Sequence, residues 1–300
     1  MKKPFEIKGK RVFITGAARG IGEAVAKQLH RQGAHVALVG LEIDKLKATT
    51  NALGNRAICV EADVCDKEAV SKAVENTLKA FGGIDIVIAN AGIYQVSPLS
   101  DVPSAAIERT LDVNLYGAWN TLHATLPHIK QNKGYVLTIT SLAALTHGPL
   151  MGAYAASKAA VEALTDSLRI ELQPEGVGVG CAYFGAIDTD LVQGGKQHQA
   201  LAQMEQMMPK FIRQPAPLSE AVDVIEAGIK QRSARLWAPR WLGAFLLLRG
   251  FAQPLLEWRL AHDRRTADAL AVAYDVSIRD SFQDHPLGVA MLASHQKEQE

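Results

Sequence analysis

Short apolar runs alternate with longer stretches of helical period along most of the chain. The apolar runs cover residues 11–15, 35–40, 56–64, 84–92, 134–141 and 177–185, with a further run at 234–239. Strand-length runs that alternate with helical stretches are typical of βα units, whose strands pair in parallel. We therefore expect an α/β fold, a doubly wound parallel sheet of about seven strands with helices on both faces.

Composition limits what this fold is used for. The chain has 300 residues, of which 48% are hydrophobic and 6% aromatic, and its net charge is +1. This charge provides no basic field for nucleic acid. The three cysteines lack C-x-x-C spacing and the histidines lack ligand spacing, so we expect no metal site. The first residues contain no apolar core of a signal peptide, which favours a cytoplasmic protein.

No linker divides the alternating part, so we expect one domain over 1–239. Within it, residues 189–217 have a looser pattern with a Pro-rich exit, which is typical of a loop with a helical insert. Residues 240–300 read as a helical C-terminal extension that packs on the domain or on a partner subunit.

A glycine-rich turn follows the first apolar run. It reads Thr15-Gly16-x-x-x-Gly20-Ile21-Gly22 and leads into a helical stretch. A strand, a tight turn and a helix start bring free backbone N–H groups and the positive end of a helix dipole together, which suits a pyrophosphate. The alternative is an ordinary βα turn, and the spacing differs from the usual G-x-G-x-x-G.

A second pattern lies around the fifth run. Ser141 ends the run, and Tyr154 and Lys158 follow, four residues apart on one face of a helical stretch. An ammonium beside a phenol stabilises the phenolate and makes it usable as a proton donor or acceptor. Alone, the pair is also compatible with a helix that carries a solvated lysine and a half-buried tyrosine.

Together these residues resemble the short-chain dehydrogenases/reductases. The glycine turn, Asn90-Ala91-Gly92, Asn114, Ser141, Tyr154 and Lys158 occur in the order and spacing of that family. The similarity covers about residues 8–237. It implies a Rossmann-type sheet, a nicotinamide cofactor, a small carbonyl or alcohol substrate, and a homodimer or homotetramer.

The resemblance also implies residue roles. Tyr154 would be the general acid/base, Lys158 would lower the pKa of Tyr154 and bind the nicotinamide ribose, Ser141 would polarise the substrate oxygen, and Asn114 would hold a proton-relay water. Cofactor contacts are expected from Gly16, Arg19, Gly20, Ile21, Gly22, Gly40, Leu41, Asp63, Val64, Asn90, Ala91, Gly92, Tyr154, Lys158, Gly185, Ile187 and Thr189.

Two positions depart from the family pattern. Phe184 precedes Gly185 where the family usually has proline. Gly40 ends the second run where an acidic residue usually accepts the ribose 2′-OH of NAD. Arg19 would pair with a 2′-phosphate, so we expect NADP in preference to NAD. Glu42 is the alternative, as an acceptor for a ribose hydroxyl.

Two apolar groups lie outside the common pattern. Met204, Met207, Met208 and Phe211 would form a lid over a lipophilic substrate, or would simply pack a helix. In the extension, an apolar stripe has helical spacing, and Pro254 would kink its helix or start a second one. Burial of the stripe is favoured over membrane attachment through flanking arginines. The stripe consists of Phe245, Leu248, Phe251, Leu255 and Trp258, and the arginines are Arg249, Arg259 and Arg264.

The sequence therefore favours an NAD(P)-dependent enzyme that interconverts an alcohol and a ketone or aldehyde. Two alternatives remain at this point. One is a dinucleotide-binding scaffold that has lost turnover. The other is a membrane-attached oxidoreductase that modifies lipids.

Overall fold

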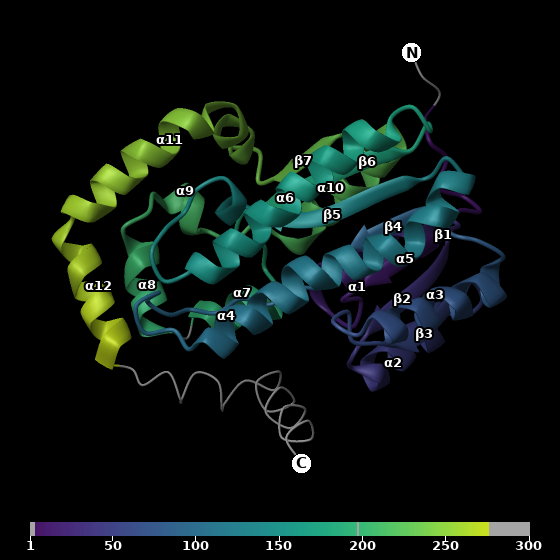
Figure 1. Ribbon diagram of the computed structural model, residues 1–300, viewed down its shortest axis with the longest axis horizontal. Coiled ribbons are helices and arrows are strands. Elements are labelled where there is room, and N and C mark those ends of the chain that lie inside the picture. Colours follow the sequence, from purple (N-terminus) through teal and green to yellow (C-terminus); the bar gives the residue numbers. More distant parts are fainter. Residues whose placement is uncertain (1–3, 197, 276–300) are drawn as a thin grey trace.

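The computed structural model describes residues 4–196 and 198–275. Its centre is one parallel sheet of seven strands, as the sequence predicts, and the strands follow the order β3-β2-β1-β4-β5-β6-β7 (Figure 1). The strands are β1 Arg11–Thr15, β2 His35–Gly40, β3 Ala57–Glu61, β4 Ile86–Ala89, β5 Tyr135–Ser141, β6 Gly178–Phe184 and β7 Arg235–Ala238. The order reverses at β1 and β4, and in such sheets the crevice at this point binds ligands.

Helices cover both faces of the sheet, because successive strand residues point to opposite sides. Ile14 packs with Leu29 and Ile225 on one face, whereas Phe13 packs with Leu122 and Leu168 on the other. The helices of the alternating part are α1 Gly20–Arg31, α2 Ile43–Leu53, α3 Lys67–Phe81, α4 Ser104–Leu111, α5 Gly117–Gln131, α6 Gly152–Leu172 and α10 Leu218–Gln231.

The third and fourth strands are shorter than the apolar runs that predict them. β3 ends at Glu61 and β4 at Ala89, although the runs continue to residues 64 and 92. The remaining residues form the loops that leave the carboxyl ends of the strands. Those loops carry several of the residues that the sequence assigns to a cofactor.

The long helical stretch at about 104–131 is interrupted. Between α4 and α5 the chain makes a π-helical turn, Asp112–Tyr116, which contains Asn114. Such turns insert one residue into a helix and often occur at functional sites. At its end, Gly117 lies against Val64, where a Cβ atom would be 2.5 Å from the valine Cγ2. The turn therefore lets the helix approach the loop after β3.

Beyond β6 the chain forms a lobe and then the extension. The lobe has three short helices, α7 Asp190–Lys196, α8 Gln199–Gln206 and α9 Lys210–Arg213. The extension contains α11 Leu242–His262 and α12 Arg264–Asp275. α12 packs on α8, and α11 curves along the outside between β7 and α12 (Figure 1). Pro254 lies inside α11, and the next helix begins only at Arg264.

The apolar stripe of the extension is mostly uncovered. Phe245 packs with Trp241 and Leu242, whereas Leu248, Phe251, Leu255 and Trp258 are exposed. No described part of the chain buries these four side chains. Among the described helices, none is long and apolar enough to cross a membrane.

Candidate active site

A cavity of about 560 Å³ lies at the carboxyl ends of the strands on either side of the sheet's reversal point. Apart from Gly22 and Asn114, every residue that the sequence assigns to catalysis or cofactor binding lines this cavity. These are Gly16, Arg19, Gly20, Ile21, Gly40, Leu41, Asp63, Val64, Asn90, Ala91, Gly92, Ser141, Tyr154, Lys158, Gly185, Ile187 and Thr189.

The glycine turn after β1 packs closely against the loop after β4. Gly16 has a φ of +63°, and a Cβ on it would be 2.8 Å from the Cα of Ala91. Gly22 lies behind the turn, where a Cβ would overlap the carbonyl oxygen of Gly16. The turn therefore needs glycine for backbone conformation at Gly16 and for close packing at Gly22.

Asn90 fastens this turn to β4. Its side-chain amide donates to the carbonyl oxygens of Thr15 and Gly16, both at 3.0 Å. Its backbone N–H donates to Thr15 Oγ1 at 3.2 Å. Thr189 approaches from the opposite side, 3.6 Å from where a Cβ on Gly20 would lie. The N–H groups at the start of α1 are thereby held at one wall of the cavity.

Ser141, Tyr154 and Lys158 meet at the other end of the cavity. The Ser141 side chain hydrogen-bonds Tyr154 and also accepts from the N–H of Ala143 at 3.1 Å. Lys158 donates to the carbonyl oxygen of Ile139 at 3.0 Å, and its Nζ lies 5.7 Å from the Tyr154 ring centre. Strand β5 supplies the serine and helix α6 the other two.

Burial dominates the protonation of this group. Burial raises the pKa of Tyr154, while the hydrogen bond from Ser141 lowers it. Burial also lowers the pKa of Lys158 to about 8. In this structure the ammonium donates to the Ile139 carbonyl oxygen, and the lowering of the Tyr154 pKa by Lys158, expected from the resemblance, stays a prediction.

Asn114 supports the site from behind. Its amide nitrogen donates to the Ile93 carbonyl oxygen at 2.8 Å and to Ser157 Oγ at 2.9 Å, and its Oδ1 accepts from the N–H of Ile93. Ser157 in turn donates to the backbone oxygen of Tyr154 at 2.7 Å. A Cβ on Gly92 would be 3.2 Å from both Asn114 Oδ1 and Lys158 Nζ. The glycine therefore leaves space beside the buried Lys158 ammonium, and the water relay through Asn114 stays a prediction.

At the far end of the cavity, the two residues that the sequence offered as alternatives contact each other. Arg19 Nε lies 3.3 Å from Glu42 Oε2, and Lys45 lies 2.6 Å from the other oxygen of the same carboxylate. Gly40 and Leu41 form the adjacent wall. This end of the cavity thus holds two cations around one carboxylate.

Sequence reasoning missed one residue that shapes the site. Arg109 from α4 lines the cavity, where it contacts Asp63 at 3.3 Å and Cys65 Sγ at 3.3 Å. Arg109 comes from a segment without a motif, so no local pattern marks it. Residues 93–96 were expected to contact the substrate, and in that segment the Tyr94 ring lies 6.0 Å from that of Tyr154, while its hydroxyl donates to the Leu191 carbonyl oxygen at 3.0 Å.

Phe184 lines the cavity where the family usually has proline. It ends β6 and is almost fully buried. The N–H of Gly185 donates to the carbonyl oxygen of Ala238 at 2.9 Å, so β7 holds this turn. The backbone is therefore fixed by strand pairing rather than by a proline ring.

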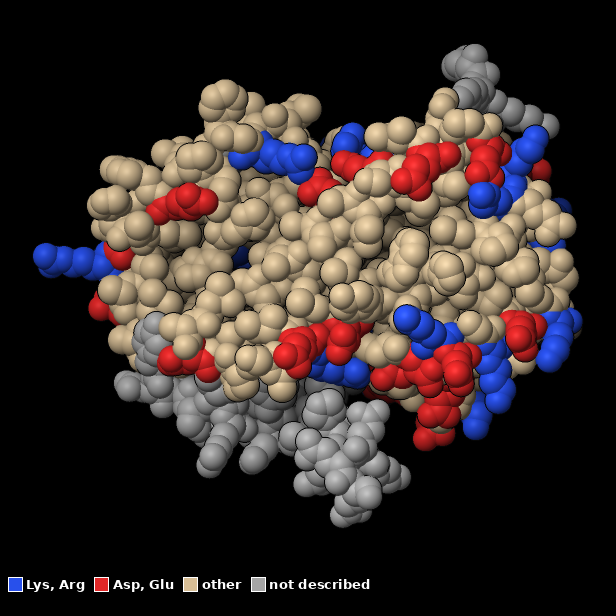
Figure 2. Space-filling view, viewed as in Figure 1, with Lys and Arg blue, Asp and Glu red and all other residues tan. Residues whose placement is uncertain are grey.

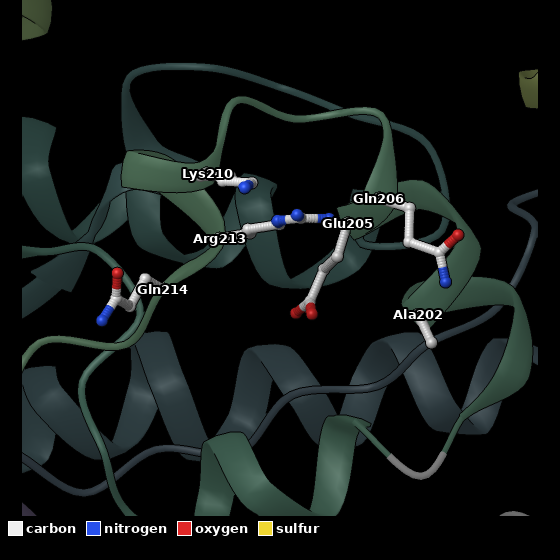
Figure 3. Close-up of a pocket in the computed structure, with 6 residues that line it drawn as sticks. All are labelled: Ala202, Glu205, Gln206, Lys210, Arg213 and Gln214. Atoms are coloured by element: carbon white, nitrogen blue, oxygen red, sulfur yellow. The ribbon is translucent and has the colours of Figure 1, made fainter.

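A second cavity of about 470 Å³ lies in the lobe between α8 and α9 (Figure 3). It is lined by Ala202, Glu205, Gln206, Lys210, Arg213 and Gln214. Burial, followed by the charges of Tyr154 and Glu205, raises the pKa of Tyr94 to about 12.

The family model described as short chain dehydrogenase matches residues 10–200. The chain belongs to the short-chain dehydrogenase family. It is 32% identical over 227 residues to the oxidoreductase UcpA of Salmonella typhimurium, and the matched region covers 74% of this chain and 86% of UcpA. It is 30% identical over 256 residues to 11-beta-hydroxysteroid dehydrogenase-like 3 of Arabidopsis thaliana, covering 84% of this chain and 80% of the relative.

Solved structures of short-chain dehydrogenases share the fold. One from Burkholderia cenocepacia in complex with NADP has a TM-score of 0.70 and 30% identity, and covers 78% of this chain and 97% of its own. Another, from Burkholderia phymatum in complex with NAD, has a TM-score of 0.73 and 24% identity, and covers 82% of this chain and 94% of its own. The protein is an NAD(P)-dependent oxidoreductase of this family, whose members bind either cofactor.

Proposed function

We propose that this enzyme interconverts an alcohol and a ketone or aldehyde, with Tyr154 as the general acid/base. The observation that carries the proposal is the meeting of Ser141, Tyr154 and Lys158 at one end of a cavity whose other wall is a helix start. A scaffold that only binds a dinucleotide has no use for a buried tyrosine hydrogen-bonded to a serine.

The cavity fits a dinucleotide on the evidence of its glycines. A side chain at Gly92 would crowd Lys158, and the start of α1 offers N–H groups to a pyrophosphate. A bound nicotinamide cofactor supplies or accepts the hydride. Lys158 would bind the ribose in the space that Gly92 leaves, and Thr189 and Ile187 would hold the carboxamide end.

The protein's own residues manage the proton. In the reductive direction Tyr154 donates its phenolic proton to the substrate oxygen, and Ser141 hydrogen-bonds the same oxygen. Lys158 carries a positive charge at neutral pH, because its pKa of about 8 lies above 7. This charge, beside the ring, stabilises the phenolate that the transfer leaves.

Among the two cofactors we propose NADP(H). The second strand ends in Gly40, so no carboxylate lies at the position that usually accepts the 2′-OH of NAD. Arg19 and Lys45 both lie next to Glu42. A 2′-phosphate would take the place of that carboxylate as the partner of Arg19.

The substrate side supports a lipophilic substrate. Met204 is buried against α12, so this residue packs a helix, as the alternative had it. Met208 and Phe211 instead expose their side chains on the lobe that follows Thr189. Leu191 lines the cavity, and its backbone oxygen accepts a hydrogen bond from Tyr94, whose ring lies 6.0 Å from that of Tyr154.

We further propose a homodimer or homotetramer. Tyr116, Trp119, Leu164 and Ile170 expose large apolar side chains along the π turn, α5 and α6. These are the helices that carry or follow Asn114 and Tyr154, and pairing them with a second copy would remove this surface from water.

The proposal is tested by titrating the purified protein with NADH and NADPH while following cofactor fluorescence. Turnover is then measured on a panel of aliphatic and aromatic carbonyls. Tight NADPH binding with turnover supports it, and Arg19→Ala should weaken NADPH binding while leaving NADH binding unchanged. NADPH binding without turnover of any carbonyl would favour the scaffold alternative, and a preference for NADH abolished by Glu42→Gln would reverse the cofactor choice.

A further inference from the structure

The outer side of α11 carries a continuous apolar face. Because successive helix residues turn by 100°, its exposed large side chains fall within an arc of about 100°. They are Leu247 (87% exposed), Leu248 (56%), Phe251 (82%), Leu255 (65%) and Trp258 (64%). No Asp, Glu, Lys or Arg falls within this arc between 244 and 261. We call these five residues the α11 face.

The opposite side of α11 is attached to the domain, which fixes the orientation of the face. Arg249 binds Glu162 of α6 at 2.6 Å. Gln253 accepts from the N–H of His147 at 2.7 Å and donates to its carbonyl oxygen at 3.3 Å. Leu260 packs toward α8 and α12. The α11 face therefore points away from the domain. Along the same edge of the molecule, separate basic and acidic side chains stand between stretches of tan surface (Figure 2).

From this arrangement we propose that α11 lies on a lipid surface, with the α11 face inserted among anionic lipids. Amphipathic helices of this kind bind in the plane of the interface through apolar side chains and flanking cations. Arg259 borders the face, and Arg240 and Arg264 lie just beyond its two ends. None of these three arginines makes an ion pair with a described residue, so all are available to anionic headgroups.

A second copy of the chain fits this face less well. Stable protein interfaces use about 20–30 residues on each side, whereas the α11 face offers five large side chains. The exposed apolar residues of α5 and α6 lie on other elements and provide a separate surface for self-association. Trp258 and Phe251 also suit the boundary between headgroups and acyl chains.

The lipid surface would lie beside the substrate lobe. The rings of Phe211 and Trp241 are 5.7 Å apart, and those of Trp241 and Phe245 are 5.4 Å apart, so aromatic contacts connect α9 to the start of α11. His147, which Gln253 binds, belongs to the loop between Ser141 and Tyr154. A lipophilic substrate dissolved in the bilayer would thus reach the lobe directly, and this part of the inference rests on the proposed oxidoreductase function.

Flotation of the full-length protein tests the inference. Vesicles of phosphatidylcholine, alone or mixed with phosphatidylglycerol, are compared for the wild type, for Leu247→Gln/Phe251→Gln, and for Leu99→Gln as a control in the loop between β4 and α4. All three substituted side chains are exposed, so folding should persist. We expect the wild type and the control to float, most strongly with the anionic lipid. The double variant should lose on the order of 100-fold in partitioning.

Further readouts separate the outcomes. Arg259→Gln should weaken binding to the vesicles that contain phosphatidylglycerol but not to those of phosphatidylcholine. The tryptophan emission of the wild type should shift to shorter wavelength when vesicles are added, and Trp258→Phe should lose this shift. A wild type that ignores both vesicles, or a double variant that floats equally well, would overturn the inference. So would a change of oligomer mass in the double variant with vesicle binding intact, which would assign the face to a second copy. NADPH turnover of a water-soluble carbonyl is assayed in parallel, so that a failure of the oxidoreductase proposal is seen separately.

Discussion

At the carboxyl ends of β1, β4 and β5, side chains bond the backbone of neighbouring loops, whereas α11 exposes its largest side chains to the surroundings. Asn90 joins β4 to the glycine turn, and Asn114 joins the loop after β4 to α6 through Ser157. In α11, the contacts to the domain are one exposed ion pair, one glutamine and the packing at the two helix ends.

This difference reflects how precisely each region must fix the positions of its side chains. A catalytic group must stay in place to within a fraction of an ångström, which requires locked side chains and satisfied hydrogen bonds. A surface helix needs only its attached side to keep its orientation. The same substitution should therefore have opposite consequences in the two regions, and variants can test this directly.

The largest effect is expected from Tyr154→Phe. Losing a positioned general acid should lower kcat by about 10²–10⁴-fold, with NADPH affinity unchanged, because the phenolic oxygen acts on the substrate. Tyr94→Phe, which removes a hydroxyl bonded only to the Leu191 backbone oxygen, is the matched control and should keep most of its turnover. Equal losses in both variants would remove Tyr154 from its assigned role.

Lys158 should make stability depend on pH. Its folded pKa of about 8 lies below the ordinary value of 10.5, so between these values the unfolded chain binds more protons than the folded one. The contribution of Lys158 to the free energy of unfolding should therefore rise with pH in this window, whereas the buried Cys65 and Cys181 thiols, whose pKa is raised, act in the opposite direction. Chemical denaturation of the cofactor-free protein is compared for the wild type and Lys158→Met from pH 8 to about 9.5, below the range of ordinary phenols. The wild type should gain stability relative to Lys158→Met as pH rises, and equal slopes for the two proteins would contradict the shift.

Gly22→Ala should lower the free energy of unfolding by about 1–3 kcal/mol. The new methyl group would overlap the Gly16 carbonyl oxygen and lie 3.0 Å from the Cα of Ala17. Cofactor affinity should fall as well, since the turn must move. Thermal melts and NADPH titration measure the two effects, and a variant with wild-type values for both would show that the turn is not tightly packed.

Gly250→Ala in α11 should have the opposite effect and raise the free energy of unfolding. No atom lies within 4 Å of the added methyl group, and alanine is favoured over glycine in a helix interior by about 0.5–1 kcal/mol. Hydrogen exchange of α11 amides should slow, with turnover unchanged. Faster exchange would indicate that another group packs against this side of α11 and that the added methyl group disrupts this contact.

The smallest effect is expected from Arg249→Met. Because the arginine is half exposed, its ion pair with Glu162 should contribute no more than about 1 kcal/mol. Glu162 keeps its hydrogen bond from Tyr183, so the core should not change. Exchange should speed up in α11 while α6 stays protected. A large drop in global stability would instead tie the extension to the domain core.

The local sequence predicted much of the fold. Each strand is a short apolar run, and the glycine turn, Ser141, Tyr154 and Lys158 lie at fixed spacings, so a linear pattern was enough to place them at one edge of the sheet. The residues at the ends of β3 and β4 were assigned to the cofactor through the resemblance to the short-chain dehydrogenases/reductases, whose motifs they match in sequence order. These features depend on neighbours in sequence.

Only the tertiary structure decided the rest. Arg109 reaches Asp63 across 46 positions, and Arg19 faces Glu42 because two loops meet. The π turn at Asn114, which brings Gly117 against Val64, has no signal in the local sequence. The periodicity of α11 predicted an apolar stripe but not its exposure. A hydrophobic pattern states which side chains share a face, whereas the packing of the whole chain determines what that face meets.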